Sequence, residues 1–373
     1  MHQVVATPQD DKFAVVRQGE QKALHIPRSF YEEVVEAVAG GSPVPGWLAD
    51  AAQAAWGLRP AGQPSDTAVL VRPLTILNYS RATFEINKGC NFGCEHCFLP
   101  ERKFEGLGMD EKRLLLTMLR DAGVLWLQFT GGEPTIDRDF PAAYRMAHGM
   151  GMLLELLTNG SRLYQPAMID MLTALPPHKV MVSLYGATSE SFDALTRRRD
   201  SFKGVMKGIA AAKEAGIPLE ITLIITKRNA HEVDAMRDLA DRYGVYRKEY
   251  GSISPTYDGG NEPLATQAED WIGRSSVFAG CPAGYRFFHV DPHGWVTMCK
   301  IGRENPINLL AEGLSGLTRL PAIADSQMSR AGGCSGCKLS KTCRVCRPLA
   351  KVYQEAEAPL RTYCQHGMKE ATK

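Results

Sequence analysis

The chain lacks both a long hydrophobic run and a strong net charge. Its 373 residues contain no apolar stretch of the roughly 18 or more residues that a membrane-spanning helix needs. The formal net charge is only +2 at pH 7, which argues against a general nucleic-acid or membrane-surface role, because both depend on a dense basic face. The first residues, MHQVVATPQDDKF, lack the apolar core of a secretory signal. We therefore expect a cytoplasmic protein with neither membrane nor nucleic acid as a partner.

Cysteine is too sparse for a disulfide framework. The chain holds ten cysteines among 373 residues, well below the density of small disulfide-stabilised proteins. In a reducing compartment, clustered cysteines are typical of metal binding or redox chemistry. With 44% hydrophobic and 23% charged residues, the composition is that of an ordinary globular protein. The positions of the cysteines are therefore the main guide to function.

Residues 1–66 are predicted to form a small α+β unit. Pro43 and Pro45 break the chain between two helical stretches. Residues 61–66 (AGQPSD) have the composition of a linker. The expected elements are strands over 13–16 and 23–26, and helices over 29–39 and 47–56.

Residues 80–257 alternate between predicted strands and predicted helices. Such alternation favours a parallel sheet with right-handed crossovers. Six strand–helix units in a row indicate an α/β fold of the partial (β/α)6, TIM-like barrel type, although a doubly wound open sheet fits the pattern almost as well. The six predicted strands cover residues 83–87, 125–130, 153–158, 180–185, 220–226 and 249–255.

The alternation stops near residue 258, and residues 258–373 are predicted to form a loop-rich C-terminal domain. This region holds seven of the ten cysteines. The segment Asp291-Pro292-His293-Gly294 suits a type I turn, with Asp, Pro and Gly at its first, second and fourth positions. We expect a hairpin over 286–299 that returns Cys299 to the neighbourhood of Cys281.

The first three cysteines follow the first predicted barrel strand with the spacing Cys-x3-Cys-x2-Cys. They are Cys90, Cys94 and Cys97. Three thiolates on one loop can hold a 4Fe–4S cube and leave its fourth iron open to a small molecule. A zinc site with His96 as the fourth ligand is the alternative, but His96 directly precedes Cys97 and would have to fold back sharply.

This cysteine spacing after a first strand resembles the signature of the radical S-adenosylmethionine (SAM) superfamily. Further motifs of that family occur at the ends of the next predicted strands, in the same order, between residues 80 and 255. In a barrel, the carboxyl ends of the strands form the active site. The matching segments are Thr130-Gly131-Gly132-Glu133-Pro134, Thr158-Asn159-Gly160, Ser183-Leu184-Tyr185-Gly186 and Leu195-Thr196-Arg197.

The resemblance implies a SAM-binding 4Fe–4S cluster on the first three cysteines. It also implies that a donor such as flavodoxin or ferredoxin supplies an electron, that SAM is cleaved to methionine and a 5′-deoxyadenosyl radical, and that the radical abstracts a substrate hydrogen. Taken singly, each motif has a plain structural alternative, such as a turn, a buried hydroxyl or a solvated basic loop. The residues implied to contact SAM are Phe98, Gly131, Gly132, Glu133, Asn159, Ser183 and Arg197, the last three as candidates for the ribose and the carboxylate.

The other seven cysteines resemble those of the SPASM extension, which binds two auxiliary 4Fe–4S clusters. The chain departs from that pattern in having two residues, Arg344 and Val345, rather than three between the fifth and sixth cysteines of this set. The resemblance implies an outer cluster on Cys334, Cys337, Cys343 and Cys364, and an inner cluster, one protein ligand short, on Cys281, Cys299 and Cys346.

Other interpretations of the C-terminal cysteines remain open. One auxiliary cluster with spare thiols is the first alternative. Structural zinc is the second, although a zinc ribbon needs a longer gap between its Cys-x2-Cys pairs than the one found here. His289, Asp291 and His293 lie nearby in the sequence, and we assign them to the strand and turn of the hairpin rather than to the inner cluster.

The resemblance also suggests a substrate class. SPASM enzymes mostly modify peptides or proteins, and the N-terminal unit is similar to a peptide-recognition domain, to which an extended leader peptide could add as a strand. The unit is shorter than a full recognition domain, and the alternative is that it is an N-terminal cap on the barrel. We expect a maturase that installs a thioether or carbon–carbon crosslink in a ribosomally made peptide. Because all ten cysteines are assigned to clusters, we do not expect an epimerase that donates hydrogen from a cysteine. The alternatives are a sulfatase-maturase-like Ser/Cys dehydrogenase, oxidation of a small molecule such as a sugar alcohol, and a non-catalytic metal-binding interaction protein.

Overall fold

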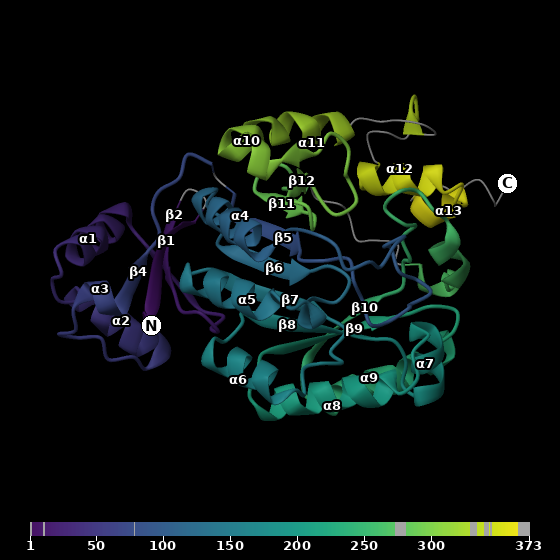
Figure 1. Cartoon of the computed structure of the whole chain (residues 1–373), viewed down its shortest axis with the longest axis horizontal. Coiled ribbons are helices and arrows are strands. Elements are labelled where there is room, and N and C mark those ends of the chain that lie inside the picture. The colour runs from purple at the N-terminus through teal and green to yellow at the C-terminus, as the bar shows by residue number, and fades with distance from the viewer. Residues whose placement is uncertain are drawn as a thin grey trace.

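A computed structural model describes residues 2–9, 12–77, 79–272, 281–328, 334–338, 343 and 345–364. These residues form two β-sheets with helices packed on them (Figure 1). A nine-stranded sheet lies at the centre of the molecule, and the four-stranded sheet of the N-terminal unit lies beside it. Within the described ranges, no helix combines the length and the apolar character needed to cross a membrane.

Six parallel strands form the barrel part of the large sheet, and their order in space follows the sequence. Because this order never reverses, the partial barrel is confirmed and the doubly wound alternative is wrong. The sixth strand begins earlier than predicted. It is polar and exposed, which is possible because it lies at the edge of the sheet and, among the described strands, pairs only with the fifth. The strands are β5 (Arg81–Glu85), β6 (Trp126–Thr130), β7 (Leu153–Thr158), β8 (Lys179–Leu184), β9 (Leu219–Ile224) and β10 (Tyr246–Tyr250).

The helices between these strands cover the outer face of the barrel sheet (Figure 1). The first of them, α4, begins where the backbone N–H of Gly108 donates to the Glu111 carboxylate over 2.9 Å. It turns Leu115 and Leu119 into the core, where both are fully buried. The helices are α4 (Met109–Asp121), α5 (Phe140–Gly149), α6 (Pro166–Ala174), α7 (Ser189–Thr196), α8 (Ser201–Glu214) and α9 (Val233–Asp241), with short 3-10 turns at Pro134–Ile136, Ala230–Glu232, Glu262–Thr266, Glu269–Trp271 and Leu317–Arg319.

The C-terminal region continues the barrel sheet. The predicted hairpin is present: the N–H of Asp291 donates to the carbonyl of Trp295 over 2.9 Å, and Gly294 has a φ of +81°. The sequence did not reveal that its first strand pairs in parallel with β5, so that the hairpin extends the barrel. The elements are β11 (Phe287–Val290), β12 (Trp295–Thr297), β13 (Ile307–Asn308), α10 (Leu309–Gly316), α11 (Leu320–Met328), α12 (Arg347–Glu355) and α13 (Leu360–Tyr363).

The N-terminal unit is larger than the sequence indicated. Two further strands, before and after the predicted elements, complete a sheet of order β3-β2-β1-β4. The expected linker over 61–66 is wrong, because Ser65 is fully buried and its N–H donates to the carbonyl of Ser42 over 2.8 Å. The elements are β1 (Val4–Gln9), β2 (Lys12–Val16), β3 (Ala23–Ile26), α1 (Arg28–Ala39), α2 (Gly46–Trp56), α3 (Ser65–Ala68) and β4 (Val69–Val71).

This unit is fixed to the barrel by apolar packing and by backbone-directed hydrogen bonds. Val5 and Val16 share a buried cluster with Leu125 and Leu153 at the starts of β6 and β7. The Gln18 side-chain amide donates to the carbonyls of His148 and Met152 over 2.7 and 2.8 Å. The contact between the unit and the barrel is therefore a continuous part of the protein interior.

Gly151 lies at this junction and tests the packing. Its φ is +74°, and a Cβ there would lie 2.6 Å from Leu70 Cδ2 and 3.0 Å from Val5 Cγ1. Gly151→Ala should therefore lower the free energy of unfolding by more than about 1 kcal/mol, measured by urea denaturation. Gly149→Ala is the matched control: a Cβ there meets no atom within 4 Å, so stability should stay the same or rise slightly. Equal effects of the two substitutions would contradict this junction.

Candidate functional site

The loop after β5 carries the first three cysteines into a cavity of about 470 Å³. Cys90, Cys94 and Cys97 all line this cavity, together with residues from the carboxyl ends of β6 to β10. The loop is held to the end of α7 by two backbone bonds, from Gly93 N to Thr196 O and from Glu95 N to Leu195 O, over 2.8 and 3.2 Å. The spacing in the sequence and the barrel topology thus place three thiols at the end of the barrel where active sites occur.

A bidentate ion pair also braces the cysteine loop. Glu95 lies between the second and third cysteines, and its carboxylate accepts from Arg228 Nη2 and Nε over 2.7 and 3.3 Å. Arg228 follows β9, so the pair joins the loop to the opposite side of the barrel. Two parallel N–H···O bonds fix the relative orientation of the planar groups as well as their separation.

The surroundings of the thiols fit ligands of an iron–sulfur cluster. Burial raises the pKa of Cys90 to about 11 and raises that of Cys94 further, and the neighbouring cysteines add to both shifts. These thiols would stay protonated without a cation, and bound iron supplies the charge that stabilises thiolates. The three thiols lie on one loop and line one cavity, with open space beside them. This arrangement suits a 4Fe–4S cluster that is held by three cysteines.

The zinc alternative finds no support in the geometry. Across the described ranges, no three His, Cys, Asp or Glu side chains are gathered closely enough to hold one metal ion, whereas a cube lets each thiolate bind a different iron. The His96 ring lies 5.2 Å from the Tyr185 ring, centroid to centroid.

Two glycines bring the loop after β6 against the cysteine loop. A Cβ on Gly131 would lie 2.2 Å from Asn87 O, and one on Gly132 would lie 2.1 Å from Gly89 O. No other residue type allows this approach without moving the backbone. Both glycines line the cavity, so the same contact shapes the wall beside the thiols.

Three further residues implied by the resemblance line the cavity: Phe98, Asn159 and Ser183. The Asn159 side-chain amide donates to Asn91 Oδ1 over 2.9 Å, within the cysteine loop. The hydroxyl of Ser183 is hydrogen-bonded to Tyr185. The structure thus gathers Phe98, Gly131, Gly132, Asn159 and Ser183 around one space with the three thiols.

Glu133 does not line the cavity, in contrast to its expected contact with SAM. Its carboxylate is fully buried and accepts from Thr135 N, Thr135 Oγ1, Thr158 Oγ1 and Asn159 N over 3.0, 2.6, 2.7 and 2.6 Å. Burial raises its pKa, and these hydrogen bonds oppose the shift. The four donors occupy the carboxylate, so Glu133 joins the loops after β6 and β7 behind the cavity wall.

Arg197 also lies outside the cavity. It ends α7 in the left-handed conformation, with a φ of +51°, and its side chain is 66% exposed. It lines an open groove of about 990 Å³ that shares Cys94, Cys97, Leu99 and Arg102 with the cavity. The expected contact of Arg197 with the SAM carboxylate is therefore not supported by its position.

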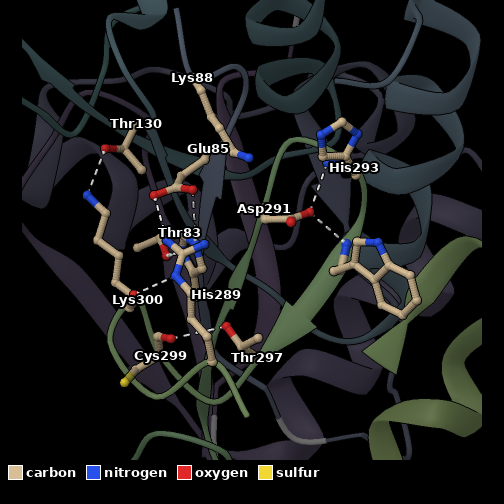
Figure 2. A network of polar contacts seen from close by, with 12 residues as sticks. Thr83, Glu85, Lys88, Thr130, His289, Asp291, His293, Thr297, Cys299 and Lys300 are labelled. Atoms are coloured by element: carbon tan, nitrogen blue, oxygen red, sulfur yellow. Dashed lines mark hydrogen bonds and ion pairs between the residues drawn. The ribbon is translucent and has the colours of Figure 1, made fainter. Parts of the chain in front are cut away.

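A buried polar network connects the barrel interior with the C-terminal hairpin (Figure 2). Glu85 accepts from Arg303 Nη2 over 3.0 Å and lies 3.5 Å from His289 Nε2, whose ring is bonded through Nδ1 to the Thr83 hydroxyl over 2.7 Å. Burial alone would raise the pKa of Glu85, but contact with His289 and the charges of Arg303 and Lys300 hold it well below its usual range. Burial lowers the pKa of His289, so we treat that ring as neutral and Arg303 as the partner of the carboxylate.

Lys300 links this network to the cavity. Its Nζ donates to Thr130 Oγ1 over 3.4 Å (Figure 2). The same Nζ lies 4.3 Å from the centre of the Phe98 ring. Its backbone carbonyl accepts from Arg303 Nε over 2.8 Å. Burial lowers the pKa of Lys300, while Glu85 opposes the shift.

Some of the described C-terminal cysteines lie within electrostatic range of one another. Besides burial, Cys281 raises the pKa of Cys299, and Cys299 and Cys281 both raise the pKa of Cys346. Cys334 and Cys364 both lie near Tyr363, and the N–H of Cys337 donates to the carbonyl of Cys334 over 3.4 Å. Arg344, in the shortened interval before Cys346, lies outside the described residues. His289, Asp291 and His293 are strand and turn residues, as expected.

The sequence analysis missed Glu85, Arg303 and Lys300. A signal was present for Glu85, because it is a carboxylate at the end of a strand whose inner residues are apolar, and such a residue needs a buried partner. Arg303 and Lys300 carry no such signal. Their roles follow from the pairing of β11 with β5, which the sequence pattern did not indicate.

The middle of the chain matches a known protein family. Residues 84–240 match the family described as "Radical SAM superfamily". Mycofactocin maturase MftC of Mycobacterium tuberculosis (strain ATCC 25618 / H37Rv) is 30% identical over 245 residues, which cover 59% of this chain and 60% of the relative. PqqA peptide cyclase of Rhizobium meliloti (strain 1021) is 28% identical over 172 residues, covering 45% and 46%. The chain thus matches less than two thirds of the length of these curated relatives.

Solved structures share the fold over a larger part of the chain. Streptococcus suis SuiB bound to the precursor peptide SuiA superposes with a TM-score of 0.63 at 15% identity, covering 97% of this chain and 98% of SuiB. The protein anSMEcpe with bound AdoMet superposes with a TM-score of 0.54 at 15% identity, covering 76% and 93%. At these identities the likeness is one of fold.

The network in Figure 2 makes a prediction about coupling between the barrel and the C-terminal region. Glu85 is fully buried, and Arg303 is 16% exposed at its side chain. Glu85→Gln or Arg303→Met alone should lower the free energy of unfolding by about 3 kcal/mol, because each leaves a buried charge without its partner. The double variant should lose at least about 1 kcal/mol less than the sum of the two, measured by urea denaturation. Strictly additive losses would show that the pair is not coupled.

Proposed function

We propose that the protein is a radical SAM maturase that installs an oxidative thioether or carbon–carbon crosslink in a ribosomally made peptide. The match of residues 84–240 to the radical SAM superfamily is the premise. The observation that carries the proposal is the cavity at the carboxyl ends of the strands. It brings Cys90, Cys94 and Cys97 together with Gly131 and Gly132. Two separate motifs of the sequence thus meet at one space of a size that suits a small-molecule ligand.

The residues around the cavity have distinct proposed roles. Cys90, Cys94 and Cys97 hold a 4Fe–4S cluster. When bound, the cluster and SAM together supply a 5′-deoxyadenosyl radical that abstracts a hydrogen atom from the substrate. Phe98, Gly131, Gly132, Asn159 and Ser183 contact SAM, while Glu133 holds the loops that carry them. A flavodoxin or ferredoxin donates the electron, and a reducing cytoplasm is the compartment that suits this chemistry.

The C-terminal region would hold two auxiliary 4Fe–4S clusters. The mutual proximity of Cys281, Cys299 and Cys346 supports the inner cluster. The neighbourhood of Cys334 and Cys364 supports the outer one, with Cys337 and Cys343 as its other ligands. An oxidative crosslink removes two electrons and two protons in all, and auxiliary clusters beside the cavity would give the chain a place for the second electron.

The N-terminal unit supports a peptide as the substrate. Strands β1, β2 and β3 form an antiparallel sheet in which β3 pairs only with β2 among the described strands. Its outer edge offers backbone groups to which an extended leader peptide can add. The fold likeness to SuiB covers 97% of the chain and includes this unit, whereas the likeness to anSMEcpe covers 76%. A folded unit with a strand edge favours peptide maturation over oxidation of a sugar alcohol.

The first prediction for this function concerns SAM. Anaerobically reconstituted protein, reduced with dithionite, should convert SAM to 5′-deoxyadenosine. Replacing any one of Cys90, Cys94 and Cys97 by Ala should abolish the product, because the cluster loses a ligand and with it the open iron. Chromatography of the nucleoside products measures both.

The matched control changes Cys281, Cys299 and Cys346 to Ala together. This variant should lose about four of the about twelve iron atoms that three cubes contain, yet still cleave SAM. Cleavage of SAM by a variant that lacks Cys94, or stoichiometric zinc with no cleavage in the native chain, would refute the assignment.

The second prediction concerns the product. A precursor peptide co-produced with the enzyme should become lighter by two hydrogen atoms, because a crosslink forms one bond at the expense of two bonds to hydrogen. Mass spectrometry with fragmentation measures the change and locates the linked residues. An excess of the free leader segment should reduce modification of the full precursor without reducing SAM cleavage, because the two compete for the outer edge of β3. An unchanged mass with altered retention would indicate epimerisation and contradict the crosslink.

A further inference from the structure

Lys300 presents a positive charge to the cavity. Glu85 and Cys97 act on it electrostatically, but neither forms a hydrogen bond or ion pair with its Nζ. Among the described residues, its Nζ is hydrogen-bonded only to the Thr130 hydroxyl, over 3.4 Å, and it faces the Phe98 ring. No aspartate or glutamate from the described part of the chain lines the cavity. The other cation of the cavity wall, Arg102, is already engaged by the carbonyl of Cys94 over 2.8 Å and by Cys97.

The nearest carboxylate, Glu85, is committed to other partners. Arg303 Nη2 donates to it over 3.0 Å, and His289 Nε2 lies 3.5 Å away. Arg303 also donates from Nε to the backbone carbonyl of Lys300 over 2.8 Å. Glu85 and Arg303 therefore fix where the Lys300 backbone lies, while the Lys300 side chain extends past them toward Thr130 (Figure 2).

An ammonium in such a place needs an anion. A part-buried cation with one long hydrogen bond and one aromatic ring has lost much of its hydration and has not recovered it from protein acceptors. A single ammonium balances a single carboxylate, whereas a phosphate calls for several donors. The residue expected to meet a carboxylate, Arg197, lies in the outer groove instead.

We propose that Lys300 binds the carboxylate of a ligand in this cavity, which is either the α-carboxylate of SAM or a carboxylate of the substrate peptide. Lys300 is thus a binding residue contributed by the C-terminal region to a cavity built mainly by the barrel. The assignment rests on the proposed function. It implies that the contact between Lys300 and the carboxylate depends on the hairpin whose strand β11 pairs with β5.

The first arm of the test uses SAM and decarboxylated SAM. Affinities are measured by equilibrium dialysis with reconstituted wild-type, Lys300→Met and Lys300→Arg proteins, matched for iron and sulfide content. If Lys300 holds the SAM carboxylate, Lys300→Met weakens SAM by at least about tenfold and leaves decarboxylated SAM unchanged. Lys300→Arg should recover most of the affinity, because it restores the charge.

The second arm uses a synthetic peptide library in which one position is an equimolar mixture of Glu and Gln. The SAM-loaded proteins are immobilised, and the retained peptides are read by mass spectrometry. If Lys300 holds a substrate carboxylate, the wild-type protein retains the Glu forms in excess, and Lys300→Met retains both equally while its SAM affinity is unchanged. Lys227→Met is the control, because Lys227 lies in the outer groove and donates to the carbonyl of Ala265.

Two results overturn the proposal. One is a Lys300→Met protein with unchanged SAM affinity together with equal retention of Glu and Gln peptides by the wild-type protein. The other is a Lys300→Met protein that loses affinity for SAM and for decarboxylated SAM equally, because Lys300 would then not act on the carboxylate. Failure of the proposed function has a different signature, namely the absence of 5′-deoxyadenosine from the wild-type protein, and both affinity arms can be read without turnover.

Discussion

The backbone of the loop after β6 touches the backbone of the cysteine loop, and the rest of the site depends on that contact. A side chain on Gly131 or Gly132 would meet Asn87 O or Gly89 O at little more than 2 Å. Glu133 then locks the contact from behind by accepting four hydrogen bonds from the loops after β6 and β7. Three thiols, two glycines and Asn159 come to line one cavity because these loops cannot separate without breaking the buried bonds of Glu133.

A second constraint joins the C-terminal region to the same space. The pairing of β11 with β5 places His289 beside Thr83, and Glu85 binds Arg303, so that the segment from Cys299 to Arg303 lies against the barrel interior. One end of this segment is a proposed ligand of the inner auxiliary cluster, and its neighbour Lys300 reaches the cavity. The proposed sites for SAM, substrate and auxiliary cluster are therefore parts of one packed unit, in which a change in the hairpin would be felt at the cavity.

The sequence predicted the features that depend on local patterns. The first five barrel strands follow from the alternation of apolar strands and amphipathic helices, and the hairpin follows from Asp291 and Gly294 in a type I turn. Strand β1 contains Pro8, which is unfavourable in a strand because proline has no backbone N–H to donate. The structure accommodates it because β4 pairs with β1 only up to Ala6, so the side of β1 that faces β4 needs no hydrogen bond at Pro8. Contacts between distant segments were not predictable in this way. Glu133 and Arg197 sit in family motifs, yet neither lines the cavity. Glu133 is buried in hydrogen bonds to the loops after β6 and β7, and Arg197 ends α7 and lines the outer groove, and only the packed structure reveals this.

The central claim is that Cys90, Cys94 and Cys97 alone hold a cluster whose open iron meets SAM. It is tested most directly by electron paramagnetic resonance of a variant in which the seven C-terminal cysteines are replaced by Ala. After reconstitution and reduction, this variant should show the signal of one 4Fe–4S cluster, and added SAM should change that signal because the ligand binds the cluster itself. A signal that SAM leaves unchanged, or no cluster on the three remaining cysteines, would contradict the account.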